Sequence, residues 1–123
     1  MQKIEGTTIK VNRGDILNFT FSIKKEDGTN YTFQIGDTIR FAVYNKEGLN
    51  SGSLLLKEIV VDSESQSIEI ELTSSETKIG NIVNKPIDYW YEIELNGEHT
   101  IIGYDDAGAK IFRLYPEGSK IEW

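Results

Sequence analysis

Hydrophobic and polar residues alternate along several short segments of the chain. The clearest case is residues 16–23, where Leu17, Phe19, Phe21 and Ile23 are separated by polar residues. Because successive side chains of a β-strand point to opposite faces of a sheet, this period of two predicts a strand with one buried face. The apolar patterns together predict about eight strands, within residues 7–11, 16–23, 38–44, 54–61, 67–72, 89–95, 100–104 and 110–115, with a further short extended piece at residues 31–33.

Turn-forming dipeptides separate these segments, as at Asp27-Gly28 and Asn96-Gly97. One connection differs, because Thr73-Ser74-Ser75-Glu76 has the spacing of a capping box and predicts a short helical turn through about Asn81. The same dipeptide also precedes two long strands, at Gly14-Asp15 and at Gly36-Asp37. This repeat indicates either a pair of strands in one hairpin or a coincidence.

The number and length of the strands predict an all-β fold, an immunoglobulin-like antiparallel β-sandwich of about seven to eight strands with one short helical turn. Residues 1–123 form a single domain in this interpretation. A helical turn before a Tyr-rich strand is where such folds cross between sheets, and Tyr89 or Tyr91 would make the hydrogen bond at that corner. The chain contains no Cys, which excludes an antibody-type domain with its disulfide.

Composition restricts the partners and the compartment. The net charge of −7 opposes binding to nucleic acid, which requires clustered cations. No apolar run approaches the roughly 18 residues of a membrane span, and residues 1–7 lack the apolar core of a signal peptide. We therefore expect a chain that is made in the host cytoplasm, is not secreted by a signal peptide, and binds neither nucleic acid nor membrane.

Candidate catalytic and metal-binding residues are few, so we expect no enzyme, no cofactor and no metal. His99 is the only histidine and falls in a predicted hairpin loop, where it lacks the oriented neighbours of a catalytic base. Residues 26–30 and 105–108 carry closely spaced oxygens that could join a weak calcium site, but Asp, Asn and Gly are also the usual residues of turns. The alternating carboxylates of the two acidic strands fit a solvated outer face better than a glycosidase pair; they are Glu69, Glu71, Glu92 and Glu94.

Several segments resemble a known family in their order along the chain. They are residues 19–23, 27–28, 36–44, 68–72 and 89–95, followed by Tyr115-Pro116-Glu117-Gly118. Together they resemble the immunoglobulin-like modules of tailed phages of Gram-positive bacteria. The similarity is to the N-terminal domain of upper baseplate proteins and to short clostridial prophage structural proteins, and it covers roughly residues 7–118.

The resemblance implies a non-enzymatic structural protein of a phage or phage-like particle. A capsid decoration protein or other virion accessory protein is the first expectation, and a baseplate or tail attachment module is the second. Either role implies localisation in the virion and multi-copy assembly with major capsid, baseplate or tail proteins. The alternative function is a β-sandwich module that binds carbohydrate or the host surface, which would require two or three coplanar aromatic rings.

Three residues are candidates for an interface. Trp90 shares a strand face with Glu92 and Glu94, so its indole points outward unless a loop such as residues 49–54 folds over it. Ile121 and Trp123 alternate with polar residues in a C-terminal segment, residues 119–123, that could add a strand to a neighbouring molecule.

We predict that deleting residues 119–123 leaves the melting temperature within a few degrees of the parent but markedly weakens self-association or incorporation into particles. Burying an Ile-sized side chain in a partner contributes about 1.5 to 3 kcal/mol, and multiple copies multiply such contacts. Calorimetry and sedimentation measure the two effects separately. Equal loss of stability and association would instead make residues 119–123 the last strand of the core, and loss of neither would leave Trp90 as the better interface candidate.

Overall fold

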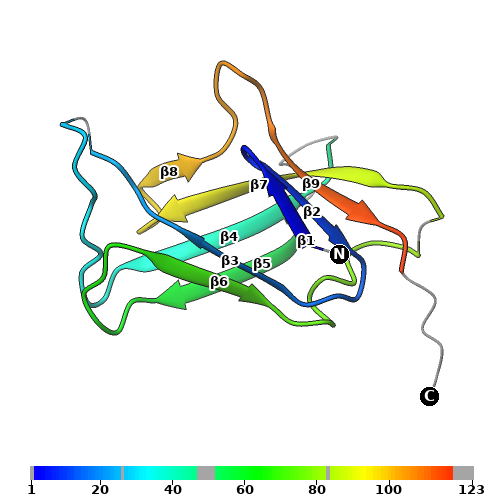
Figure 1. Ribbon diagram of the computed structural model, residues 1–123, viewed down its shortest axis with the longest axis horizontal. Helices are drawn as coiled ribbons and strands as arrows, with labels where there is room; N and C mark the ends of the chain where they lie inside the picture. The colour runs from blue at the N-terminus through cyan, green and yellow to red at the C-terminus, as the bar shows by residue number, and fades with distance from the viewer. Residues whose placement is uncertain (1, 26, 47–51, 83, 118–123) are drawn as a thin grey trace.

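The computed structural model describes residues 2–25, 27–46, 52–82 and 84–117, which form nine β-strands (Figure 1). The strands are β1 (Gln2–Glu5), β2 (Thr8–Asn12), β3 (Leu17–Phe21), β4 (Thr38–Tyr44), β5 (Ser53–Val60), β6 (Ile68–Leu72), β7 (Ile87–Leu95), β8 (His99–Ile102) and β9 (Lys110–Tyr115).

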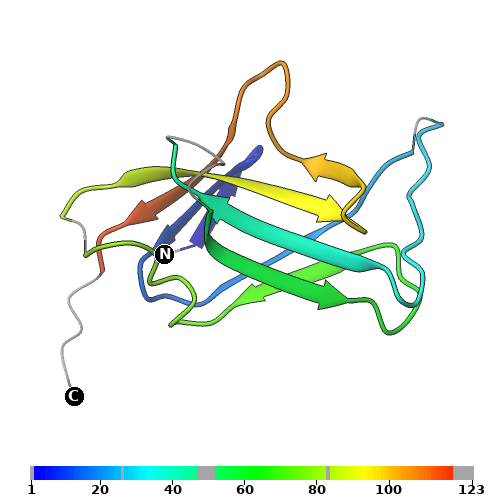
Figure 2. The ribbon, with the colours of Figure 1, turned by 180° about the vertical axis from the view of Figure 1, so that it is seen from behind.

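The strands form two sheets of unequal size. The large sheet has seven strands in the order β1-β2-β9-β7-β4-β5, with β8 added beside β7, and the small sheet is only β3 paired with β6. All described pairs are antiparallel except β2 with β9. From behind, β7, β4 and β5 of the large sheet lie nearest the viewer (Figure 2). The prediction of an all-β fold with two packed sheets is confirmed.

The core lies between the two sheets and is centred on Phe41 of β4. The Phe41 side chain is fully buried, and its ring centroid lies 5.8 Å from Phe19 of β3, 5.6 Å from Tyr91 of β7 and 6.3 Å from Phe112 of β9. Aromatic pairs at these separations add to the free energy gained by burying their surface. One ring therefore contacts both sheets.

Strand β7 has the alternation that the sequence predicts. Tyr89, Tyr91, Ile93 and Leu95 are buried, whereas Trp90 on the opposite face is half-buried. Tyr91 does not make the corner hydrogen bond, because its hydroxyl donates to the carbonyl of Thr7 in the β1–β2 turn.

Two strand expectations differ from the structure. Strand β1 was not predicted, and the segment 31–33 makes only an isolated bridge from Phe33 to Ser65. Where a helical turn was predicted, residues 74–77 form a turn and no helix, with one hydrogen bond from the Thr77 amide to the Thr73 carbonyl at 3.2 Å. The capping hydrogen bonds are present: Glu76 Oε1 accepts from the Thr73 amide at 2.9 Å, and Thr73 Oγ1 accepts from the Glu76 amide at 3.3 Å. These hydrogen bonds hold a turn between β6 and β7.

The repeated Gly-Asp dipeptide marks a repeated turn and not a hairpin pair. The Asp15 amide donates to the Asn12 carbonyl and the Asp37 amide to the Gln34 carbonyl, each at 3.0 Å. The intervening glycines have φ of 88° at Gly14 and 94° at Gly36, a region that favours glycine. The hairpin interpretation is wrong, because the strands that follow, β3 and β4, belong to different sheets.

Thr77 is the buried polar residue that joins the β6–β7 connection to the first of these turns. Its side chain is 0% exposed, and Oγ1 accepts from the Gly14 amide at 3.0 Å and donates toward the Asp15 carbonyl at 2.7 Å. The hydroxyl also lies 3.1 Å from the Ser74 carbonyl. One hydroxyl therefore satisfies backbone groups of two separate loops.

We predict that Thr77→Val lowers the free energy of unfolding by about 2 kcal/mol, because valine keeps the volume but removes the buried hydroxyl that bonds the Gly14 amide and the Asp15 carbonyl. Urea unfolding measures the change. Thr77→Ser is the matched control, since it keeps the hydroxyl and loses only a methyl group, at about 1 kcal/mol. A valine variant as stable as the parent would contradict this role for Thr77.

Candidate binding sites: an aromatic cleft and an apolar groove

The three residues predicted as interface candidates do not come together in the described structure. Trp90 lies on the outer face of the large sheet, away from the small sheet, as predicted. Ile121 and Trp123 lie outside the described residues, as do residues 49–51 of the segment 49–54 that was considered as a cover for Trp90. Only Trp90 can therefore be placed in a site.

Trp90 forms one wall of a small cleft on this outer face, which we call the aromatic cleft. Its other walls are Tyr44, Glu92 and Tyr104, and Tyr91, Ala109 and Lys110 complete the lining. The register of the sheet explains the arrangement, because Tyr44 of β4 is directly opposite Trp90 of β7 and Glu92 is two residues further along the same face. Tyr104 comes from the segment that follows β8.

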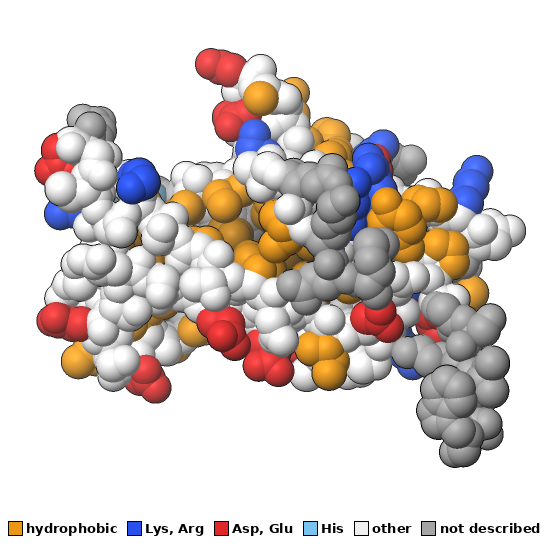
Figure 3. Space-filling model, in the orientation of Figure 1, with side chains coloured by type: hydrophobic (Ala, Val, Ile, Leu, Met, Phe, Trp, Pro, Cys, Tyr) orange, Lys and Arg blue, Asp and Glu red, His pale blue; other side chains and the backbone are white. Residues whose placement is uncertain are grey.

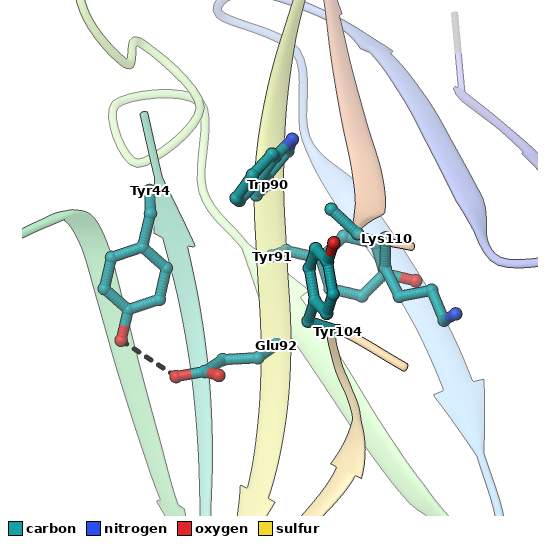
Figure 4. Close-up of a pocket in the computed structure, with 7 residues that line it drawn as sticks. Tyr44, Trp90, Tyr91, Glu92, Tyr104 and Lys110 are labelled. Carbon is teal, nitrogen blue, oxygen red and sulfur yellow. Dashed lines mark hydrogen bonds between the residues drawn. The ribbon is translucent and has the colours of Figure 1, made fainter. Parts of the chain in front are cut away.

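The side chains of the aromatic cleft surround one opening (Figure 4). The ring centroids of Trp90 and Tyr104 are 5.9 Å apart, and their planes are tilted by 54°. On the other side the Tyr44 hydroxyl donates to Glu92 Oε1 at 3.0 Å. Tyr104 is 72% exposed, so this wall is accessible from solvent.

Glu92 gives the aromatic cleft its electrostatic character. Burial and the neighbouring Glu94 carboxylate raise the pKa of Glu92, while its hydrogen bond from Tyr44 and the more distant Arg40 act in the opposite direction. Burial and the same hydrogen bond raise the pKa of Tyr44 to about 12. The hydrogen bond from Tyr44 and the charge of Arg40 therefore offset only part of the cost of a negative charge on Glu92.

The Lys110 ammonium does not neutralise Glu92. Lys110 Nζ is 2.7 Å from Asp105 Oδ1 and points away from the opening of the aromatic cleft (Figure 4). Only the aliphatic part of Lys110 remains beside the cleft. Among the residues labelled in Figure 4, the charged side chain that faces the opening is therefore the carboxylate of Glu92.

A second surface feature, the apolar groove, lies between the two sheets. It consists of two hollows. The smaller, of 130 Å³, lies between β3 on one side and β7, β8 and the β1–β2 hairpin on the other. The larger, of 560 Å³, has residues 23–25 and Tyr31, which follow β3, on one side and the ends of β7 and β8 on the other. Hydrophobic side chains line a hollow between β3 and β8 (Figure 3). The apolar lining residues are Ile4, Ile9, Phe19, Phe21, Ile23, Tyr31, Tyr91, Ile93, Leu95, Ile101 and Ile102.

The apolar groove exists because the small sheet is narrow. β3 pairs with β6 on one side, and no other described strand pairs with it. Phe19, Phe21, Ile23 and Ile102 consequently pack against the core but stay only partly buried. Side chains of this kind normally lose their exposed area when another strand or a partner covers them.

The other candidate residues lie at a strand end and in turns. His99 is exposed at the start of β8, opposite Leu95, and is one of the polar residues that line the larger hollow of the apolar groove. Asp27 Oδ1 accepts from the Thr29 amide at 2.9 Å, and Asp105 Oδ1 accepts from the Ala107 amide at 2.9 Å, which are turn-forming contacts. Within the described ranges there is no group of three His, Cys, Asp or Glu side chains suited to a metal ion, and no helix long and apolar enough to cross a membrane.

Comparison of the chain with protein-family models, with curated proteins and with solved structures found no match.

Sequence reasoning missed three of the four walls of the aromatic cleft. Glu92 was interpreted as part of a solvated face, but it is half-buried and bonded to Tyr44. The strand register that places Tyr44 opposite Trp90 could not be derived without knowing that β4 and β7 are neighbours. Tyr104 follows a short strand, and no pattern in the sequence indicates where its ring lies.

We predict that Glu92→Gln stabilises the protein relative to the parent progressively more as the pH rises from about 4 to about 7. The folded chain holds the Glu92 proton more tightly than the unfolded chain does, so the parent loses stability as the pH rises through this window. Glutamine keeps an acceptor for Tyr44 and does not ionise. Melting temperatures across the pH range measure the difference.

Glu69→Gln, on the exposed face of β6, is the matched control, and its difference from the parent at each pH is the baseline from which the Glu92→Gln difference is measured. If the Glu92→Gln difference from that baseline is flat, or falls with rising pH, the assignment of a raised pKa to Glu92 is wrong.

Proposed function

We propose that this chain is a non-enzymatic structural protein of a phage or phage-like particle, either a capsid decoration or other accessory protein or a baseplate or tail attachment module. In this proposal the sandwich is immunoglobulin-like and assembles in many copies with other virion proteins. The observation that carries the proposal is the apolar groove, because it leaves core-type side chains accessible along an unfilled side of the sandwich.

An extended segment of a neighbouring protein suits the shape of the apolar groove. From Phe19 to Ile23 the groove follows the chain for roughly 13 Å, enough for about four residues of a strand. Such a strand gains affinity from main-chain hydrogen bonds at a sheet edge and specificity from alternate side chains that enter the groove. The edge strand β5, with exposed Leu56 and Val60, offers a further surface for protein contact.

Residues 119–123 are the segment of this chain best suited to act as that strand in a neighbouring copy. Ile121 and Trp123 are two positions apart, so in an extended conformation both would face the same side. The preceding residues are fixed to the body, because Arg13 forms an ion pair with Glu117 and Asn12 Nδ2 donates to the Pro116 carbonyl at 2.7 Å. Fully extended, residues 118–123 span roughly 20 Å, enough to reach a molecule that lies against this end of the sandwich.

The alternative expectation, a carbohydrate-binding module, rests on coplanar aromatic rings. The 54° tilt between Trp90 and Tyr104 does not provide a flat stacking platform. The apolar groove is therefore better support for an assembly role than the aromatic cleft is for a carbohydrate-binding role.

Immunogold electron microscopy of particles from the organism that carries the gene tests the proposal. We expect labelling at a fixed position on heads or on tail ends, because a structural protein occupies equivalent sites in every particle. Unlabelled particles in a lysate that contains the chain would overturn the assignment.

Cysteine cross-linking tests the contact itself, and the absence of native Cys gives a clean background. Mixed Thr20→Cys and Glu122→Cys chains should form a disulfide-linked heterodimer, because Thr20 lines the groove. Glu69→Cys is the matched control, since Glu69 is opposite Thr20 on the same face of the small sheet but belongs to β6, one strand further from the groove, and does not line it. Equal cross-linking at both positions would contradict docking in the groove.

A further inference from the structure

The aromatic cleft combines three aromatic side chains with one partly buried carboxylate. We propose that it binds a quaternary ammonium group, such as the head of choline or a trimethylated amine. This function is independent of the proposed assembly role, because the aromatic cleft and the apolar groove lie on opposite faces of the large sheet and share only Tyr91.

The geometry of the walls suits a compact cation. A cation binds an aromatic face when it lies within about 6 Å of the ring centroid. With their centroids 5.9 Å apart, Trp90 and Tyr104 can both come within that distance of one group in the opening. Tyr44 forms a third wall on the other side, as Figure 4 shows.

The charges of the cleft favour a cation over an anion. Glu92 lines the opening, Glu94 lies next to it, and Lys110 is directed toward Asp105. Arg40, the cation whose charge acts on Glu92, is paired with Glu58 at 2.9 Å. The chain as a whole carries a net charge of −7. A bound ammonium group would offset the charge of Glu92 in a partly desolvated position, where an ion pair is stronger than in water.

The size of the aromatic cleft restricts the ligand to a small head group. Its volume is 70 Å³, well below the roughly 300 Å³ of sites that enclose a drug-sized molecule. A nucleotide brings phosphate groups that the carboxylates repel. A proline-rich peptide offers carbonyl acceptors, which gain nothing from a carboxylate acceptor such as Glu92.

Fluorescence titration of Trp90 with choline chloride provides a direct test. Trp123→Phe leaves Trp90 as the single tryptophan and makes the signal specific to the cleft. We expect saturable quenching or a spectral shift at millimolar choline, at an ionic strength held constant with sodium chloride. The matched ligand is 3,3-dimethylbutan-1-ol, which has the shape of choline without the charge and should bind at least about threefold more weakly.

Substitutions in the walls test the assignment of residues. Tyr104→Ala and Glu92→Gln should each weaken choline binding roughly three- to thirtyfold, because each removes one attraction to the cation. Tyr115→Leu removes a half-buried ring of β9 outside the cleft lining and should leave the affinity unchanged. Circular dichroism of each variant establishes that it is folded, and chemical shifts of the Tyr44 ring give a second readout.

Each result decides the proposal. Tetramethylammonium should bind like choline, and the relative affinities of phosphocholine and trimethyllysine then identify the carrier of the group. Equal binding of the neutral alcohol would overturn the proposal in favour of a simple apolar pocket. Binding of methyl glycosides without choline would overturn it in favour of a saccharide site, and no response to choline with a folded protein would overturn it outright.

Discussion

The structure depends on the unequal width of its two sheets. A seven-stranded sheet presents more apolar surface than the β3–β6 pair can cover. Phe41 and its aromatic neighbours fill the region where the two sheets overlap, and this overlap supplies the burial that stabilises the fold. Beside the overlap, Phe19 and Phe21 stay partly exposed along the apolar groove. The same mismatch therefore produces both a stable core and an open side.

One face of β7 contributes side chains to the core, and the opposite face contributes side chains to the proposed cation site. Tyr91 points inward, packs on Phe41 and reaches the Thr7 carbonyl, whereas Trp90 and Glu92 point outward into the aromatic cleft. A rigid central strand holds the outward side chains, since β7 pairs with β4 on one side and with β8 and β9 on the other. The cleft is thus positioned by the sheet, with Tyr104 as the wall supplied by a connecting segment.

The sequence predicted those features that depend on local periodicity. The strands β3, β4, β6 and β7 follow from alternation, and so does the outward position of Trp90. Strand β1 was missed because its four residues gain their partner only in a hairpin with β2. The groove and the cleft were not predictable, because both arise from which strands become neighbours, and that is decided by packing between distant segments.

Hydrogen exchange of β3 in the free and assembled protein tests most directly whether the open side of the sandwich is the assembly surface. The account predicts that amides of Phe19 to Phe21 exchange more slowly in particles than in the isolated chain, because an added strand covers them. Amides in the centre of β7 should exchange at the same slow rate in both states and serve as the internal reference. Unchanged exchange along β3, in particles that contain the chain, would contradict the account.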